Sequence, residues 1–204
     1  MIAPGSRSLR VKFILPALKE ATDPHWRPIK YSLFPPLGLA TLAAYLSPDD
    51  HAVIVDEHVE PLRLDDAPEL VVIQVYITNA YRAYKIADHY RNQGAFVCLG
   101  GLHVTSLPEE AAAHANVIFL GPGEQTFPSF LKDFRAGRPE QVYTSMSGRT
   151  LERVPPHPPR PHQAWFISCA KLHRGHAWLS PALRLLLQGR VFSGWQRFLH
   201  ATGR

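Results

Sequence analysis

The 204-residue chain is 46% hydrophobic and 19% charged, a composition that supports one globular core with room for a tail. No apolar run approaches the roughly 20 residues that span a bilayer, and the N-terminal residues lack the apolar segment of a signal peptide. We therefore expect a cytoplasmic protein without a membrane span. Its two cysteines, Cys98 and Cys169, exclude a disulfide framework and a cysteine-rich metal site.

The net charge of +5 conceals an asymmetry along the chain. Residues 1–144 hold 13 Lys/Arg and 16 Asp/Glu, a net charge of −3, whereas residues 145–204 hold nine Lys/Arg and one acid, a net charge of +8. Such a break favours a domain boundary. We expect a folded domain over residues 10–145, followed by a Pro-rich linker and an irregular basic tail over residues 146–204.

Short apolar runs alternate along the chain with stretches of helical spacing. We expect strands at Val11–Leu15, Ala52–Val55, Leu70–Val75, Phe96–Leu99 and Val117–Leu120. We expect helices at Phe34–Leu46, from after Asn79 to about Gln93, from after Ser106 through Ala115, and behind Glu124 to about Ala136. The last helix carries an apolar face made of Phe127, Phe130, Leu131 and Phe134.

This alternation predicts an α/β fold with helices on both faces of a parallel sheet. Because parallel crossovers are right-handed, few topologies remain. We expect a flavodoxin-like, Rossmann-like five-stranded parallel sheet in the order 2-1-3-4-5. The loops after strands one, three, four and five then line one rim, where open parallel sheets bind their ligands.

The stretch Phe96–Glu110 carries the clearest signal of a site. Its apolar run ends at Gly100-Gly101, and two glycines at the carboxyl end of a strand allow a sharp turn with no side chain between backbone and ligand. Ser106 and Glu109 have the spacing of a capping box, and Pro108 suits a first helical turn. A plain strand–turn–helix connection explains the same residues equally well.

Four motifs follow one another along the chain: Pro35-Pro36-Leu37-Gly38-Leu39, Thr78, Gly100-Gly101-x-His103-x-Thr105 with Pro108-Glu109-Glu110, and Gly121-x-Gly123-Glu124-x-Thr126-Phe127. Each alone is common in α/β proteins. In this order and on these elements they resemble the N-terminal cobalamin-binding domain of cobalamin-dependent radical SAM enzymes. That family includes methyltransferases and the anaerobic magnesium-protoporphyrin ester cyclase. The resemblance covers roughly residues 10–145.

The resemblance implies a corrinoid held against the carboxyl rim, with its nucleotide tail reaching into the sheet. It assigns cofactor binding to Pro36, Leu37, Gly38, Thr78, Asn79, Gly100, Gly101, His103, Thr105, Gly121, Gly123 and Glu124. The glycines would allow close backbone approach, the helix starts would offer N–H groups to polar atoms, and the two threonines would add hydroxyl donors. His103 is either a partner of the corrin amides or an exposed loop histidine. Glu124 is either a ligand contact or a first-turn acid favoured by the helix dipole.

Asp56-Glu57-His58 resembles part of an Asp-x-His-x-x-Gly motif whose histidine binds cobalt in other cobalamin modules. Here Pro61 stands in place of the glycine, and the motif follows strand two instead of strand one. We interpret the match as coincidence. The resemblance leads us to expect cobalamin bound without a histidine ligand, and we assign neither a catalytic residue nor a protein metal ligand.

Radical SAM enzymes of this kind continue into a barrel that opens with Cys-x-x-x-Cys-x-x-Cys, whose thiolates hold a [4Fe-4S] cluster for S-adenosylmethionine. The printed chain has no such motif, so we expect cluster and S-adenosylmethionine only in a full-length parent, and no independent catalysis here. With suitable synonymous codons, reading Lys171–Arg190 one nucleotide later spells NSIVVMHGCPQPCDFCYKD, which contains the motif. We therefore interpret the tail as out-of-frame peptide after a frameshift around Arg160–Cys169, a hypothesis that the coding DNA tests.

Two other functions stay open. A different α/β ligand module, binding a nucleotide or a flavin, is disfavoured because no Gly-x-Gly-x-x-Gly follows the first strand and no Gly-Lys-Ser/Thr occurs. An interaction protein would use the tail cations with Trp165, Trp178 and Trp195 on nucleic acid or an anionic membrane, and its binding would weaken steeply with salt. We expect no specific nucleic-acid partner. The sequence leaves the oligomeric state and the parent's substrate open.

Overall fold

The computed structural model describes residues 8–17, 36–58 and 60–145. All of them belong to one compact unit. The predicted linker, basic tail and frameshift at residues 146–204 lie outside the described residues, as do Phe34 and Pro35 of the first predicted helix. Within the described part of the chain, no helix is long and apolar enough to cross a membrane.

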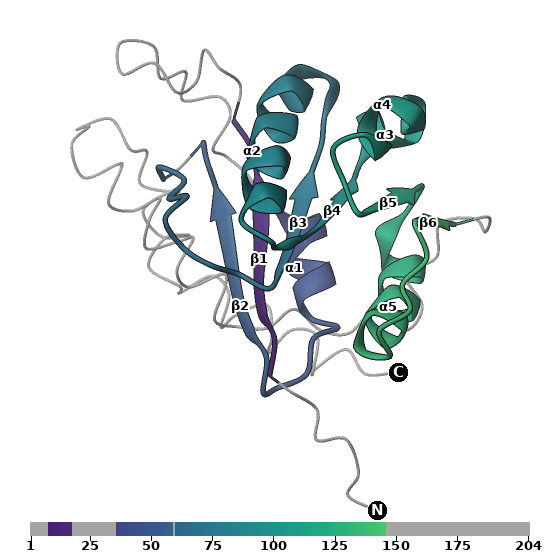
Figure 1. Ribbon diagram of the computed structural model, residues 1–204. Helices are drawn as coiled ribbons and strands as arrows, with labels where there is room; N and C mark the ends of the chain where they lie inside the picture. Colours follow the sequence, from purple (N-terminus) through teal and green to yellow (C-terminus); the bar gives the residue numbers. More distant parts are fainter. Residues whose placement is uncertain (1–7, 18–35, 59, 146–204) are drawn as a thin grey trace, which may run out of the picture. The chain divides into compact units, whose positions relative to one another are not determined.

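Across the described residues, six strands form one parallel sheet in the order β2-β1-β3-β4-β5-β6 (Figure 1). Their bounds are β1 (Arg10–Leu15), β2 (His51–Asp56), β3 (Leu70–Gln74), β4 (Phe96–Gly100), β5 (Val117–Leu120) and β6 (Val142–Thr144). The predicted α/β class and the order of the first five strands are confirmed. The predicted number of strands is wrong, because β6 pairs with β5 through Ile118 and Val142. Three residues are too few to show a strand pattern in a sequence.

Both faces of the central strands are buried. Successive strand residues point to opposite faces, so that in β3 Leu70 and Val72 belong to one apolar core and Val71 and Ile73 to the other. This explains why the strands read as near-continuous apolar runs. Cys98 in β4 is fully buried, and burial raises the pKa of its thiol, which confirms the prediction of a small buried residue.

Helices cover both faces of the sheet (Figure 1). Their bounds are α1 (Leu37–Ala43), the 3₁₀ helix η3 (Ile77–Asn79), α2 (Ala80–Asn92), α3 (Leu102–Ser106), α4 (Pro108–Ala112) and α5 (Gly123–Arg135). Residues of α2, α3 and α4 pack into one core, and residues of α1 and α5 into the other. The predicted apolar face of the last helix is confirmed, since Phe127, Phe130 and Leu131 are buried and Phe134 packs beside them.

The helix behind β4 begins earlier than the sequence indicates. α3 starts at Leu102, and Ser106 is its last residue, where the Ser106 Oγ donates to the carbonyl oxygen of Leu102 at 3.0 Å. The predicted capping box of Ser106 and Glu109 is therefore wrong. The residue that precedes α4 is Leu107, whose side chain forms no cap. Pro108 does occupy the first turn of α4, as predicted.

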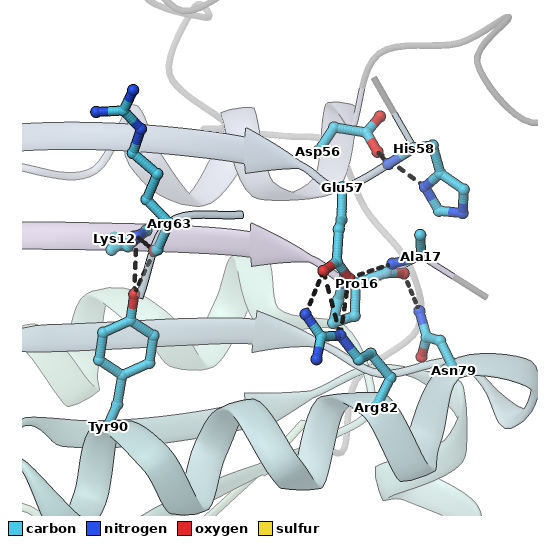
Figure 2. A network of polar contacts seen from close by, with 10 residues as sticks. All are labelled: Lys12, Pro16, Ala17, Asp56, Glu57, His58, Arg63, Asn79, Arg82 and Tyr90. Carbon is cyan, nitrogen blue, oxygen red and sulfur yellow. Dashed lines mark hydrogen bonds and ion pairs between the residues drawn. The ribbon is translucent and has the colours of Figure 1, made fainter. Parts of the chain in front are cut away.

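A buried lysine in β1 connects this strand to helix α2 and to the segment before β3. Lys12 in β1 is 3% exposed. Its Nζ donates to the Tyr90 hydroxyl at 2.8 Å and to the carbonyl oxygen of Arg63 at 2.7 Å (Figure 2). It also donates to Asp66 Oδ2 at 2.6 Å. A buried charge is tolerated when its donors are satisfied in this way. The network ties β1 to α2 and to the segment before β3, and so fixes the strands that carry the rim.

Candidate functional site

A cavity of about 400 Å³ opens at the carboxyl ends of β3, β4 and β5, next to helices α1 and α5. Of the twelve residues predicted to bind a cofactor, seven line it: Gly38, Gly100, Gly101, Thr105, Gly121, Gly123 and Glu124. The glycine turns behind β4 and β5 thus meet at one place. This is the arrangement expected of neighbouring parallel strands, whose carboxyl ends share one edge of the sheet.

The turn behind β4 requires glycine for two reasons. Gly101 has a φ of 119°, which L-residues with a side chain rarely adopt. A Cβ at Gly101 would also stand 2.5 Å from the carbonyl oxygen of Val75. At Gly100, a Cβ would lie 3.4 Å from the Cβ of Phe119. Because glycine has no side chain, the backbone itself forms this wall of the cavity.

The turn behind β5 and the start of α1 complete the glycine lining. Gly121 has a φ of 81°, and Gly123 begins α5, where a Cβ would lie 3.3 Å from Cδ2 of Leu42. A larger residue at Gly123 would therefore narrow the space between α5 and α1. Gly38 differs, because its nearest neighbour is the side chain of Gln74, at an ordinary contact distance of 3.7 Å.

Apolar side chains form much of the remaining lining, and the site residues assigned from the sequence do not include them. These side chains include Leu39 and Leu42 of α1, Val72 of β3, Phe119 of β5 and Phe127 of α5. A signal for two of them was present, because Val72 and Phe119 face the same side of the sheet near the carboxyl ends of the strands beside β4. Leu39 and Phe127 stand within the quoted motifs, but which helix side chains face the cavity depends on how α1 and α5 pack.

Thr105 joins the two glycine turns. Its Oγ1 donates to the carbonyl oxygen of Gly101 at 3.1 Å and accepts the N–H of Gly121 at 3.0 Å. The hydroxyl proton therefore already has an acceptor inside the chain, which bears against its predicted role as a donor to the ligand.

Five predicted site residues lie outside the lining of the cavity: Pro36, Leu37, Thr78, Asn79 and His103. Pro36 is buried in front of α1, whereas Leu37 is half exposed at the first position of that helix. Thr78 is exposed in η3, on the rim behind β3. Leu37 and Thr78 are therefore accessible from the rim without lining the cavity.

Asn79 is buried in the fold, where its side chain contacts the segment at the carboxyl end of β1 (Figure 2). It is 4% exposed, and its Nδ2 donates to the carbonyl oxygen of Pro16 at 2.7 Å. Glu57 makes a second contact at this end of β1. Its Oε2 accepts the N–H of Ala17 at 3.0 Å, and its carboxylate pairs with Arg82. The hydrogen bond to Glu57 raises the pKa of Arg82. These contacts fix the rim where β1 lies beside β3, the point at which the strand order reverses.

His103 packs against α2 and lies outside the cavity lining. It is 7% exposed in α3, its Nε2 lies 3.3 Å from Oε1 of Glu110, and its ring centre lies 6.0 Å from that of Tyr84. The hydrogen bond from His103 lowers the pKa of Glu110. The alternative of an exposed loop histidine is therefore wrong, and the burial of His103 gives no support to a contact with corrin amides.

The Asp56–His58 pair stands at the end of β2, the edge strand, and outside the cavity lining. The His58 N–H donates to Asp56 Oδ1 at 2.9 Å, and His58 Nδ1 lies 2.8 Å from the same oxygen (Figure 2). Across residues 8–17, 36–58 and 60–145, no group of three or more His, Cys, Asp and Glu side chains is arranged to hold a metal ion. The interpretation of this motif as coincidence stays a prediction.

Glu124 gives the mouth of the cavity a negative charge. It lies in the first turn of α5 and lines the cavity. Burial, and next the carboxylate of Glu124, raise the pKa of Tyr45, which follows α1. A carboxylate only accepts hydrogen bonds, so this edge suits a ligand that presents amide or hydroxyl donors.

A second hollow, of about 580 Å³, involves the amino end of β4 and is lined by Asp88, Arg91, Asn92, Gly94, Ala95, Phe96 and Asn116. Its charged side chains already have partners in the chain. Asp88 accepts from Nδ1 of His114 at 2.9 Å, and Arg91 donates to the carbonyl oxygen of Ala113 at 2.7 Å. Open parallel sheets bind ligands at the carboxyl edge. The candidate site is therefore the cavity at the carboxyl ends of β3, β4 and β5, the glycine-walled cavity.

The family model of the B12 binding domain matches residues 31–131. Residues 31–131 belong to the B12 binding domain family. All residues that line the glycine-walled cavity fall within this span. The cavity therefore lies in the part of the chain that matches the family, and the recognition of a cobalamin-binding domain from the sequence is confirmed.

This chain is similar to parts of several longer proteins. It is 35% identical over 121 residues to the bacteriochlorophyllide d C-8(2)-methyltransferase of Chlorobaculum tepidum, a match that covers 59% of this chain and 27% of that protein. The C-12(1)-methyltransferase of the same organism is 28% identical over 123 residues, covering 59% and 27%. An uncharacterized methyltransferase of Pyrococcus horikoshii is 31% identical over 140 residues, covering 62% and 30%. The chain thus spans less than a third of the length of each of these relatives.

Proposed function

We propose that this domain holds cobalamin at the carboxyl rim of its sheet, with the nucleotide tail of the cofactor in the glycine-walled cavity. The observation that carries the proposal is the meeting of two glycine turns over an apolar cavity within residues 31–131. The cavity volume of about 400 Å³ falls near the lower end of the range for small-molecule sites, about 300–1,000 Å³. It suits a ring-sized part of the ligand, with the corrin ring outside on the rim.

The residues present fit such a tail. A flat aromatic base gains from walls such as Leu39, Val72 and Phe119, because its burial removes apolar surface from water. Because Gly100 and Gly123 have no side chains, the glycine-walled cavity stays open at these positions. A Cβ would lie 3.4 Å from the facing side chain at Gly100 and 3.3 Å from it at Gly123. Substitution at either glycine would therefore fill space that the base needs.

Polar groups border the cavity and suit the rest of the tail. The 13-residue helix α5 begins there, and none of the described side chains caps its first turn. The N–H groups at the start of a helix favour polar atoms such as those of a phosphate. Gln74 and Glu124 also line the cavity and offer oxygen acceptors to amides or hydroxyls. These groups bind and orient, whereas bound cobalamin would supply a cobalt centre that carries a methyl group.

The parent reaction forms the wider part of the proposal. Three relatives bear the name methyltransferase, and the chain spans less than a third of each. Together with the resemblance to cobalamin-dependent radical SAM enzymes, this supports a role as the cobalamin-binding part of such a methyltransferase. The [4Fe-4S] cluster and S-adenosylmethionine belong to the parent, so this chain alone is expected to bind cofactor without catalysing methyl transfer.

Replacing Gly38 by leucine tests the assignment of the cavity. Gly38 lies in α1 and lines the cavity, and a Cβ there makes only ordinary contacts. Leucine also favours a helix over glycine by about 0.8 kcal/mol, so the fold should tolerate the change. Because the added side chain occupies space at the cavity, we expect cobalamin affinity to fall about 30-fold, or roughly 2 kcal/mol. Absorption titration of the purified full chain with cobalamin measures it.

The matched control is Ala112→Leu, which adds an apolar side chain at an exposed position of α4. It should bind cobalamin as the wild type does. Unchanged binding by Gly38→Leu would contradict the cavity as the site. A wild-type chain that binds flavin mononucleotide but no cobalamin would favour the nucleotide- or flavin-type alternative instead.

A further inference from the structure

One hydroxyl group connects the loops of two different strands in the cavity wall. Thr105 is an exposed residue of α3 that lines the cavity. Its Oγ1 lies 3.1 Å from the carbonyl oxygen of Gly101 and 3.0 Å from the amide nitrogen of Gly121. Gly101 follows β4 and Gly121 follows β5, so the hydroxyl spans the gap between the two glycine turns.

The two hydrogen bonds share one hydroxyl group. A hydroxyl has one proton and two lone pairs. When Thr105 donates its proton to the carbonyl oxygen of Gly101, a lone pair remains for the N–H of Gly121. If either turn moves, one of these bonds is lost, so the hydroxyl holds the turns at one separation.

We propose that Thr105 is a positioning residue for cofactor binding, which sets the width of the cavity by holding Gly101 and Gly121 at a fixed separation. The inference rests on the proposed function, because it takes the nucleotide tail as the group that enters the cavity. A site whose walls are already in place binds more tightly than one whose walls must be ordered on binding. Thr105 therefore acts on the ligand through the backbone of the two turns, and its own hydroxyl stays within the chain.

The test compares Thr105→Val with Thr105→Ser in the full chain. Valine keeps the shape of the side chain and removes the hydroxyl, whereas serine keeps the hydroxyl. Dissociation constants are measured for cobalamin and for cobinamide, which has the corrin ring but no nucleotide tail. We expect Thr105→Val to bind cobalamin about tenfold more weakly, a change of about 1.4 kcal/mol, and to bind cobinamide as the wild type does. Thr105→Ser should restore cobalamin affinity to within about threefold of the wild type.

Ser106→Ala is the matched control. Ser106 neighbours Thr105, and its hydroxyl makes a bond of the same kind to the carbonyl oxygen of Leu102 at 3.0 Å, within α3. Its removal should leave both dissociation constants unchanged, and the unfolding midpoint of the ligand-free variants is measured beside them.

Two results would overturn the inference. One is a Thr105→Val variant that binds cobalamin as the wild type does. The other is an equal loss of affinity for cobalamin and cobinamide, because this marks a general loss of structure. If Thr105→Val does not fold, Thr105→Ala removes the same hydroxyl with less bulk and is judged by the same results. A wild-type chain that fails to bind cobalamin would instead overturn the proposed function.

Discussion

Gly101 is the residue of the carboxyl rim at which a side chain meets the strongest steric conflict. Its φ of 119° is strained for any other residue, and a Cβ would stand 2.5 Å from the carbonyl oxygen of Val75. That oxygen also accepts the N–H of His103 at 3.3 Å, so a shift would disturb the start of α3. We expect Gly101→Ala to lower the free energy of unfolding by about 2–4 kcal/mol, measured by urea denaturation.

Gly94→Ala serves as the control for backbone strain alone. Gly94 has a φ of 84°, and a Cβ there would meet no described atom within 4 Å. Its replacement should therefore lower the free energy of unfolding by only about 1–2 kcal/mol. Equal losses for the two variants would mean that the backbone angle, and not the contact with Val75, makes glycine necessary at Gly101.

The residue-scale features differ in how far the sequence predicts them. The glycine turns were predictable because two glycines directly after an apolar run mark a turn with close backbone approach. The contacts of Thr105 and Asn79 were not. Their side chains reach partners 16 and 63 positions away in the chain, and no local pattern encodes such distances. For this reason the sequence suggested ligand contacts where the structure shows contacts within the fold.

At the scale of elements, the five longer strands follow from their apolar runs, and their observed ends differ from the prediction by no more than one residue. Buried parallel strands give this signal because both of their faces are covered. The start of α3 was missed because Gly101 leads directly into the helix and no side chain caps it. A helix that begins without a capping side chain leaves little trace in the sequence.

Asp50 links three elements and should give the stability of the fold a pH dependence. Its fully buried carboxylate accepts the N–H groups of Leu9 and Ser47, each at 2.9 Å, and pairs with Arg135 near the end of α5. Burial alone would raise the pKa of Asp50, but these hydrogen bonds outweigh it and lower the pKa. A carboxyl group with a lowered pKa stabilises the fold above its unfolded pKa of about 3.9, and this contribution is lost as the pH falls.

Asp50→Asn should therefore be less stable than the wild type by about 2 kcal/mol at pH 7, because the amide lacks the charge and one acceptor. The difference should begin to shrink below about pH 5, where the unfolded chain starts to take up the proton, and should shrink further as the pH falls toward the lowered pKa of the folded carboxylate. Urea unfolding at pH 7, 5 and 3 measures it, with Asp65→Asn as an exposed control. A difference that stays constant over this range would contradict the role of the Asp50 charge.

At the scale of the whole molecule, the folded domain extends past the family match. The match ends at residue 131, but β6 follows it and Tyr143 is 6% exposed. The ring centre of Tyr143 lies 5.7 Å from those of Phe119 and Phe130, and its hydroxyl donates to Asp133 Oδ2 at 2.9 Å. The boundary near residue 145, which the charge break predicted, stays a prediction. The frameshift hypothesis for the residues beyond it stays a prediction.

Two truncations separate the contribution of β6 from that of the basic tail. A chain that ends at Ser145 keeps β6, and we expect it to match the full chain in unfolding midpoint and in cobalamin affinity. A chain that ends at Arg138 loses Tyr143 and should lose about 3–5 kcal/mol of stability, the range for removal of a buried aromatic side chain. Urea denaturation and cobalamin titration measure both.

Lost cobalamin binding in the chain ending at Ser145 would mean that the basic tail contributes to the site. Salt-sensitive nucleic-acid binding by the full chain alone would favour the interaction role, since residues 1–144 carry a net charge of −3.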